Sequence, residues 1–315
     1  MFAVARDYIW NRSDHFKRKE AFYQDERDVT NQIIIVTGAN HGIGKQTALE
    51  LAKRGAQVVM ACRNLEKAEG AKEDILKEVP EGKLEIFKLD LGDGKSVREF
   101  SDIIHKKFPH IDVLINNAGI YIFDGKLVKT KDGFEQHMGT NHLNTFLLTL
   151  LLLDLLAKAK KSRVVNLSST VFQVAQLDVN NLNLENGVPS KMVPYANSKL
   201  ANVLFTRELA RRLGPNSNIT CYALFPGSVI TERIEDQNIF MRLWLNSLKY
   251  LVMFDLEDGC LTTLHCTLSK KAEKETGKMY RLLDVWDVEN KVNDQQAAEL
   301  WEKSEELVGL KFKKP

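Results

Sequence analysis

The stretch IIIVTGANHGIG, residues 33–44, decides the fold of this 315-residue chain. A run of β-branched residues, Ile33–Thr37, passes directly into the glycine-rich turn GANHGIG, and a stretch long enough for a helix, Gly44–Arg54, follows. β-branched runs favour strands, and glycines let the backbone turn sharply and approach a ligand closely. A strand, a glycine-rich turn and a helix in this order predict the first βα unit of a parallel sheet.

The same alternation continues along the chain. Stretches long enough for a helix, such as Lys95–Lys107 and Tyr195–Arg212, lie between most of the short apolar runs. Strands that alternate with helices predict an α/β fold, here a single doubly wound Rossmann-type domain with about seven parallel strands and helices on both faces. The expected strands after the first are Gln57–Ala61, Leu84–Leu89, Asp112–Asn116, Arg163–Leu167, Ile219–Leu224 and a seventh near Lys278–Leu283.

The domain organisation follows from where this pattern starts and stops. Residues 1–31 carry six acidic and six basic side chains and no strong apolar period, so we expect a weakly helical N-terminal extension outside the core. No Pro-, Gly- or Ser-rich linker divides residues 32–290, which we interpret as one catalytic domain. Residues 291–315 are expected to form a C-terminal helical tail.

Composition excludes several classes of protein. A net charge of +2 is too small for a binder of the nucleic-acid backbone. The four cysteines form no CxxC pair and the histidines share no ligand spacing, so no metal site is predicted. The apolar run Phe146–Leu156 contains Asp154 and is shorter than the roughly 20 residues that span a bilayer, which favours a core helix. Without a signal peptide or membrane span in the pattern, we expect a protein that is cytoplasmic or peripheral on the endoplasmic reticulum membrane, from which a salt or carbonate wash would release it.

The glycine-rich turn is typical of a site for the pyrophosphate of a dinucleotide. Its backbone N–H groups and the start of the following helix attract negative charge. The residues expected to bind the cofactor here are Gly38, Asn40, His41, Gly42, Ile43 and Gly44.

The end of the second strand indicates which dinucleotide is used. An NAD site usually places a carboxylate there, to bind the ribose 2′-hydroxyl. In this chain the strand ends Ala-Cys-Arg, and Arg63 would form charge-assisted bonds to a 2′-phosphate, which favours NADP(H) over a reading of Arg63 as a solvated loop charge. After the third strand, Asp90 and its neighbour Leu91 are assigned to the cofactor site, although helix capping explains Asp90 equally well.

A third pattern, YANSK, places a phenol and an ammonium group on one helix face. Tyr195 and Lys199 stand at i and i+4, and they follow Ser168-Ser169 at the end of the fifth strand. A tyrosine titrates near 10, so proton transfer near neutral pH requires a nearby cation to lower its pKa. Lys199 and the positively charged nicotinamide ring of an oxidised cofactor are the candidates for that cation.

Taken together, these motifs resemble the short-chain dehydrogenases/reductases. The resemblance spans about residues 32–290, and the stretches GANHGIGKQTALELAKRGAQVVMACRN, TNHLNTFLLTLLLLDLL and YANSKLANVLFTRELARRL are similar to the retinol dehydrogenase branch, the NADP(H)-using retinal reductases. The chain departs from that branch at His41 and at Asn144-Thr145. The motifs that carry the resemblance are the glycine-rich turn, Asn116-Asn117-Ala118-Gly119, Asn141, Ser169, Tyr195 with Lys199, and Pro226-Gly227.

The resemblance implies a role for each matching residue. Tyr195 would be the general acid/base, Ser169 would orient the carbonyl oxygen, and Lys199 would lower the pKa of the phenol and hold the ribose hydroxyls. Asn141 would hold a water that connects Lys199 to solvent. Around the cofactor, Asn117 and Gly119 would line the adenosine side, Pro226, Gly227 and Val229 the nicotinamide side, and Thr231 would bond the carboxamide.

The implied function is NADP(H)-dependent interconversion of a lipophilic aldehyde and alcohol of the retinal/retinol kind. A steroid or xenobiotic carbonyl reductase and a catalytically idle nucleotide-binding scaffold remain alternatives. The segment Met241–Phe254 is either core or the wall of a lipophilic pocket that also touches a membrane. In the resembled family the helix that carries Tyr195 and the preceding long helix often pair in a homodimer, so the sequence leaves monomer and homodimer open.

Overall fold

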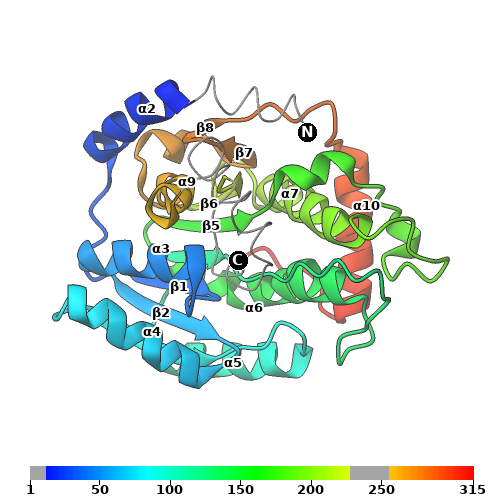
Figure 1. Cartoon of the computed structure of the whole chain (residues 1–315), viewed down its shortest axis with the longest axis horizontal. Coiled ribbons are helices and arrows are strands. Elements are labelled where there is room, and N and C mark those ends of the chain that lie inside the picture. The colour runs from blue at the N-terminus through cyan, green and yellow to red at the C-terminus, as the bar shows by residue number, and fades with distance from the viewer. Residues whose placement is uncertain (1–11, 228–254) are drawn as a thin grey trace, which may run out of the picture.

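The computed structural model describes residues 12–227 and 255–315, and in this part of the chain one sheet organises the fold (Figure 1). The strand order is β3-β2-β1-β4-β5-β6-β7-β8, and every neighbouring pair from β3 to β7 is parallel. This confirms the predicted doubly wound α/β fold. The strands are β1 (Ile33–Thr37), β2 (Gln57–Cys62), β3 (Lys83–Lys88), β4 (Val113–Asn116), β5 (Ser162–Leu167), β6 (Ile219–Phe225), β7 (Lys278–Arg281) and β8 (Asp284–Val285).

Successive residues of each strand pack into two separate cores, because side chains along a strand alternate between the faces of the sheet. In β1, Ile33 and Ile35 belong to one core, and Ile34 and Val36 belong to the other. Both faces are therefore apolar, which explains why the strands read as continuous β-branched runs.

Helices cover both faces of the sheet (Figure 1). The core that contains Ile34 is closed by α3, α4 and α9, and the core that contains Ile35 is closed by α5, α6, α7 and α10. The helices are α2 (Arg12–Asp25), α3 (Gly42–Lys53), α4 (Leu65–Glu78), α5 (Gly94–Lys107), α6 (Asn144–Lys158), α7 (Val193–Leu213), α9 (Leu256–Leu268) and α10 (Asp294–Val308), with short helical turns η1 (Met138–Leu143), η2 (Thr170–Val174), η3 (Val179–Asn181) and η5 (Lys271–Lys274).

The edge of the sheet beyond β6 differs from the prediction. The seventh strand ends at Arg281, and a two-residue turn leads to the antiparallel strand β8, which the sequence did not predict. Leu282 and Leu283, which form the turn, have φ angles of 52° and 61°. Left-handed φ at both turn positions is the geometry of a tight hairpin, but asparagine and glycine are its usual residues.

The N-terminal extension is not wholly outside the core, in contrast to the prediction. Phe22 of α2 and Val29 are 2% and 1% exposed, and both pack into the core of α3 and α9. The side chain of Lys19 donates to Asp258 of α9 at 2.8 Å, and the carboxylate of Asp25 accepts from Ser269. These contacts attach the largely polar helix α2 to α9.

The C-terminal tail contains α10, which covers α6 and α7. Trp301 of α10 is 1% exposed, and its ring lies 4.9 Å from Phe146 of α6 and 5.8 Å from Phe205 of α7. The surface of α6 and α7 that the resemblance assigns to a homodimer is therefore partly occupied by the chain's own helix. Within the described residues, Met138–Lys158 is the one helix apolar and long enough to cross a membrane, and most of it is buried, as expected for a core helix.

Candidate active site

The glycine-rich turn between β1 and α3 is built so that only glycine fits. Gly38 and Gly42 have φ angles of 68° and 55°, a region that side chains disfavour. A Cβ at Gly44 would lie 2.4 Å from the carbonyl oxygen of Gly38. Cys62 ends β2 beside the turn, and burial raises the pKa of its thiol to about 11, although the backbone N–H groups of Ala39 and Asn40 lower it in part.

The start of α3 is suited to an anion. His41 stands at its N-cap without a side-chain cap bond, and the first turn contains no acidic residue. Four other helices, by contrast, begin with a side chain that accepts a backbone N–H: Asn64 in α4, Asp93 in α5, Asp255 in α9 and Asn293 in α10. Uncapped N–H groups and the helix dipole attract phosphate. The turn and the helix start therefore fit the pyrophosphate of a dinucleotide.

Asn117 and Gly119 leave β4 beside this turn but lie in different places. The Asn117 side chain donates to the carbonyl of Thr37 at 2.8 Å, so it holds the glycine-rich turn in position. A Cβ on Gly119 would lie 3.3 Å from Asn141 Oδ1 and from Lys199 Nζ. Gly119 thus lies beside the predicted catalytic residues, whereas the sequence assigned it to the adenosine side.

Two basic residues lie at the carboxyl ends of β2 and β3. Arg63 is exposed, and Lys88 donates from its ammonium group to the Arg63 carbonyl oxygen. Asp90 does not cap a helix; its carboxylate accepts the N–H of Gly92 at 2.9 Å, while Asp93 caps α5. Leu91 is buried.

Tyr195, Ser169 and Lys199 come together where β5 ends and α7 begins. Ser169 directly follows β5, and its hydroxyl lies close enough to the Tyr195 phenol to lower the pKa of that group. Lys199 Nζ lies 5.6 Å from the centre of the Tyr195 ring and donates to the carbonyl of Leu167 at 3.2 Å. Of the two serines at the strand end, Ser168 is buried and donates to the Lys199 carbonyl at 2.7 Å, so Ser169 is the one that reaches the phenol. The predicted catalytic side chains thus form one cluster.

Burial shifts the pKa values of both titratable groups in this cluster. Burial raises the pKa of Tyr195 to about 12, although the Ser169 hydroxyl lowers it in part. Burial also lowers the pKa of Lys199 to about 8, so most of its ammonium group is still charged at neutral pH. The phenol is therefore held in its protonated form around neutral pH.

Asn141 lies on η1, a π-helical turn that continues into α6. Its side chain accepts from the N–H of Ile120 at 2.8 Å and donates to the Ile120 carbonyl at 2.9 Å and to Ser198 Oγ at 3.0 Å. Ser198 in turn donates to the Tyr195 carbonyl at 2.8 Å. Asn141 therefore ties the segment after β4 to α7, and π-helical turns of this kind are frequent at functional sites.

Asn144, where the sequence differs from the resembled branch, has a structural role. The Asn144 amide is buried and donates to the Leu91 carbonyl at 2.9 Å and to Asp132 at 3.0 Å. It thereby holds the chain after β3 beside the proposed adenosine side.

Some predictions fall at the edge of the described structure or outside it. Pro226 and Gly227 follow β6 directly, and Gly227 has a φ of 103°. Val229, Thr231 and the segment Met241–Phe254 lie outside the described residues. In the described ranges, no group of three or more His, Cys, Asp or Glu side chains is arranged to hold a metal ion.

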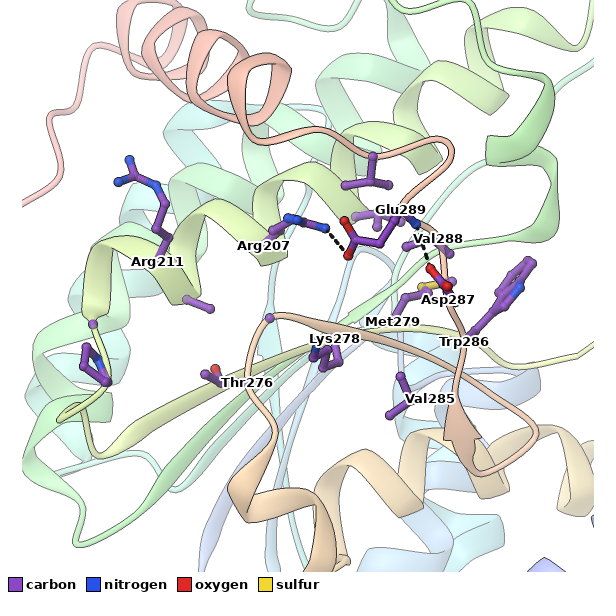
Figure 2. Close-up of a pocket in the computed structure, with 16 residues that line it drawn as sticks. Arg207, Arg211, Thr276, Lys278, Met279, Val285, Trp286, Asp287, Val288 and Glu289 are labelled. Atoms are coloured by element: carbon purple, nitrogen blue, oxygen red, sulfur yellow. Dashed lines mark hydrogen bonds and ion pairs between the residues drawn. The ribbon is translucent and has the colours of Figure 1, made fainter.

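A cavity of about 650 Å³ lies apart from this cluster, next to the second half of α7, β7 and the segment after β8 (Figure 2). Figure 2 shows Arg207 and Glu289 pointing toward one another, and their ion pair is 2.7 Å long. Arg207 follows Tyr195 by twelve positions, which is roughly 18 Å along a helix. No predicted site residue lines this cavity, so it is separate from the candidate active site.

Sequence reasoning missed a buried pair beside Tyr195. Glu135 and His137 are each 2% exposed, Glu135 Oε1 lies 2.8 Å from His137 Nδ1, and the His137 ring lies 6.2 Å from the Tyr195 ring. Their only signal in the sequence is the spacing of Glu and His two residues apart, which is too common to indicate a site.

Comparison with known proteins shows the family to which the chain belongs. The model of the short chain dehydrogenase family matches residues 32–239. Human retinol dehydrogenase 12 is 39% identical over 282 residues, which cover 89% of this chain and 87% of that protein. Human retinol dehydrogenase 11 is 41% identical over 280 residues, which cover 89% of this chain and 86% of that protein.

Solved structures agree with the fold. An uncharacterised protein from Mycobacterium paratuberculosis is 33% identical with a TM-score of 0.73, over 92% of this chain and 98% of that chain. A short chain dehydrogenase from Escherichia coli CFT073, solved in complex with NADPH, is 25% identical with a TM-score of 0.63, over 81% of this chain and 98% of that chain. The chain therefore belongs to the short-chain dehydrogenase/reductase family, and it is an oxidoreductase that acts on CH–OH and C=O groups with a nicotinamide cofactor.

Proposed function

We propose that this protein reduces a lipophilic aldehyde to its alcohol with NADPH, with Tyr195 as the proton donor. The observation that carries the proposal is the cluster of Ser169, Tyr195 and Lys199, in which a protonated phenol lies beside a second hydroxyl and an ammonium group. Two hydroxyl groups at one point are what a carbonyl oxygen needs to accept a proton as it is reduced.

Each residue has one task in this proposal. Tyr195 gives its proton to the carbonyl oxygen, and Ser169 donates a hydrogen bond to the same oxygen and orients it. Lys199 stabilises the phenolate that remains and holds the ribose hydroxyls. Asn141 keeps the segment at Ile120 against α7, and it is the point from which a water would connect Lys199 to solvent.

The cofactor is proposed to be NADP(H). When bound, NADPH supplies the hydride that is added to the carbonyl carbon. The residues that would hold it are the glycine-rich turn with the uncapped start of α3, Arg63 at the 2′-phosphate, and Lys199 at the ribose. Gly227 and Pro226 would border the nicotinamide, together with Val229 and Thr231.

Arg63→Ala should remove most of the preference for NADPH over NADH while sparing turnover with NADH. One charge-assisted contact to the 2′-phosphate contributes on the order of 1.5–3 kcal/mol, which corresponds to about 10- to 150-fold in kcat/KM. The measurement is kcat/KM for both cofactors at a saturating aldehyde concentration. Lys106→Ala, which removes another exposed cation, is the matched control and should leave the ratio unchanged. Equal efficiency of the unmutated protein with the two cofactors would sink the proposal.

The substrate class rests on the relatives, two of which are retinol dehydrogenases. We propose a retinal-like aldehyde, and the test is a panel of all-trans-retinal, medium-chain aldehydes and steroid ketones with NADPH. Highest efficiency with retinal or the aldehydes supports the proposal. Highest efficiency with the ketones makes the protein a steroid or xenobiotic carbonyl reductase, and no turnover in the whole panel supports an idle nucleotide-binding scaffold.

A further inference from the structure

The chain segment after β4 presents apolar side chains to solvent. We define the post-β4 segment as residues 119–128. Its exposed residues are Tyr121 at 39%, Ile122 at 36%, Phe123 at 40%, Leu127 at 42% and Val128 at 42%. Single exposed apolar residues are ordinary, but a cluster of them in one short segment indicates a binding surface.

Two rings of this segment pack on the Tyr195 side chain. The ring centres of Tyr121 and Phe123 lie 6.1 Å and 5.9 Å from that of Tyr195, and they lie 5.7 Å from one another. These are distances at which aromatic rings attract one another. A carbonyl group that reaches the Tyr195 hydroxyl has the rest of its molecule next to these rings.

Hydrogen bonds to the backbone hold the two rings in place. Ile122, which lies between them, donates its N–H to His137 Nε2 at 3.0 Å. Since Nε2 accepts, the proton is on Nδ1 and is donated to Glu135 Oε1 at 2.8 Å. The Glu135 carboxylate also accepts the backbone N–H groups of His137 at 3.0 Å and Met138 at 2.8 Å. The buried pair is thus well hydrogen-bonded and rigid.

A second anchor lies two residues earlier. The Asn141 side chain holds both the N–H and the carbonyl of Ile120, at 2.8 Å and 2.9 Å. Residues 120 and 122 are therefore fixed through their backbone, which gives the exposed rings of Tyr121 and Phe123 a defined position.

We propose that Tyr121 and Phe123 form the surface that binds the apolar tail of the substrate, and that His137 is a positioning residue for it. The proposal rests on the proposed function, because it assumes that the carbonyl reacts at Tyr195. It specifies the substrate class as molecules with a carbonyl at one end and a long apolar tail.

The test compares decanal with propanal, which share an aldehyde group and differ in the tail. In Phe123→Ala and Tyr121→Ala, the ratio of kcat/KM for decanal to that for propanal should fall about tenfold, mainly through a higher KM for decanal. Leu127→Ala removes an equally exposed apolar side chain that makes no ring contact with Tyr195, and it should leave the ratio unchanged.

The role of His137 is tested by a pair of substitutions. His137→Gln retains an acceptor for the Ile122 N–H and should keep the decanal-to-propanal ratio near that of the wild type. His137→Phe retains the ring but not the acceptor and should lower the ratio as Phe123→Ala does. Equal effects of the two His137 variants would contradict a positioning role, and the ring variants test the surface even when His137→Phe does not fold.

Two outcomes separate this proposal from the proposed function. If the wild type reduces propanal and decanal but the ratio is the same in Phe123→Ala, Tyr121→Ala and Leu127→Ala, the tail-binding surface is wrong and the reductase assignment stands. If the wild type reduces neither aldehyde with NADPH, both are overturned.

Discussion

Tyr195→Phe is expected to lower aldehyde turnover by roughly 10²–10⁴-fold, the usual contribution of a positioned general acid. The substitution removes only the hydroxyl, so the ring should keep its packing against Tyr121 and Phe123. Because burial raises the pKa of Tyr195 to about 12, the wild-type phenol is protonated at neutral pH and ready to donate. The measurement is steady-state reduction of an aldehyde with NADPH at pH 7.

The same pKa gives the expected direction of catalysis. Oxidation of an alcohol requires the phenolate, which a raised pKa makes scarce at neutral pH, so oxidation should become faster as the pH increases while reduction should not. NADPH affinity, measured by fluorescence titration, is the control and should stay close to normal in Tyr195→Phe. Turnover like that of the wild type in this variant would contradict the assignment of Tyr195 and favour another acid or the scaffold alternative.

The parts of the fold and site that follow a local rule could be predicted. The β-branched runs gave the parallel strands, because a strand buried on both faces needs apolar residues at every position. The turn at Gly38–Gly44 was visible because its backbone admits only glycine, and Tyr195 and Lys199 were visible because helix periodicity places i and i+4 together.

What could not be predicted depends on contacts between distant segments. The hairpin at Leu282-Leu283 lacks turn residues, and both leucines are buried, so tertiary packing sets their backbone. The burial of Tyr195, which raises its pKa, could not be predicted because it depends on the surrounding packing rather than on the YxxxK spacing. Glu135 and His137 hold the backbone of Ile122 through hydrogen bonds. These bonds join segments whose contact cannot be read from the sequence.

Lys199→Met is expected to lower turnover by at least about 10²-fold and yet to stabilise the cofactor-free protein. Lys199 is 5% exposed, and burial lowers its pKa from 10.5 to about 8, so folding at neutral pH must accommodate a desolvated ammonium group. That shift corresponds to about 3 kcal/mol of the free energy of unfolding. Methionine has a similar length without the charge, and Asn202 still donates to the Leu167 carbonyl at 3.2 Å. The buried ammonium group beside the phenol thus lowers the stability of the folded protein.

The dependence of this stabilisation on pH identifies its cause. Between pH 8 and 10.5 the unfolded wild type binds the Lys199 proton and the folded wild type does not, so wild-type stability gains from this residue as the pH rises. The advantage of Lys199→Met should therefore be about 3 kcal/mol below pH 8 and decline toward zero near pH 10.5. Urea unfolding of both proteins at pH 7 and 9.5 measures it, with Lys106→Met as the exposed control that should show no such trend. If the variant is less stable than the wild type at pH 7, or if the difference does not change with pH, then burial of the charged Lys199 does not destabilise the folded protein.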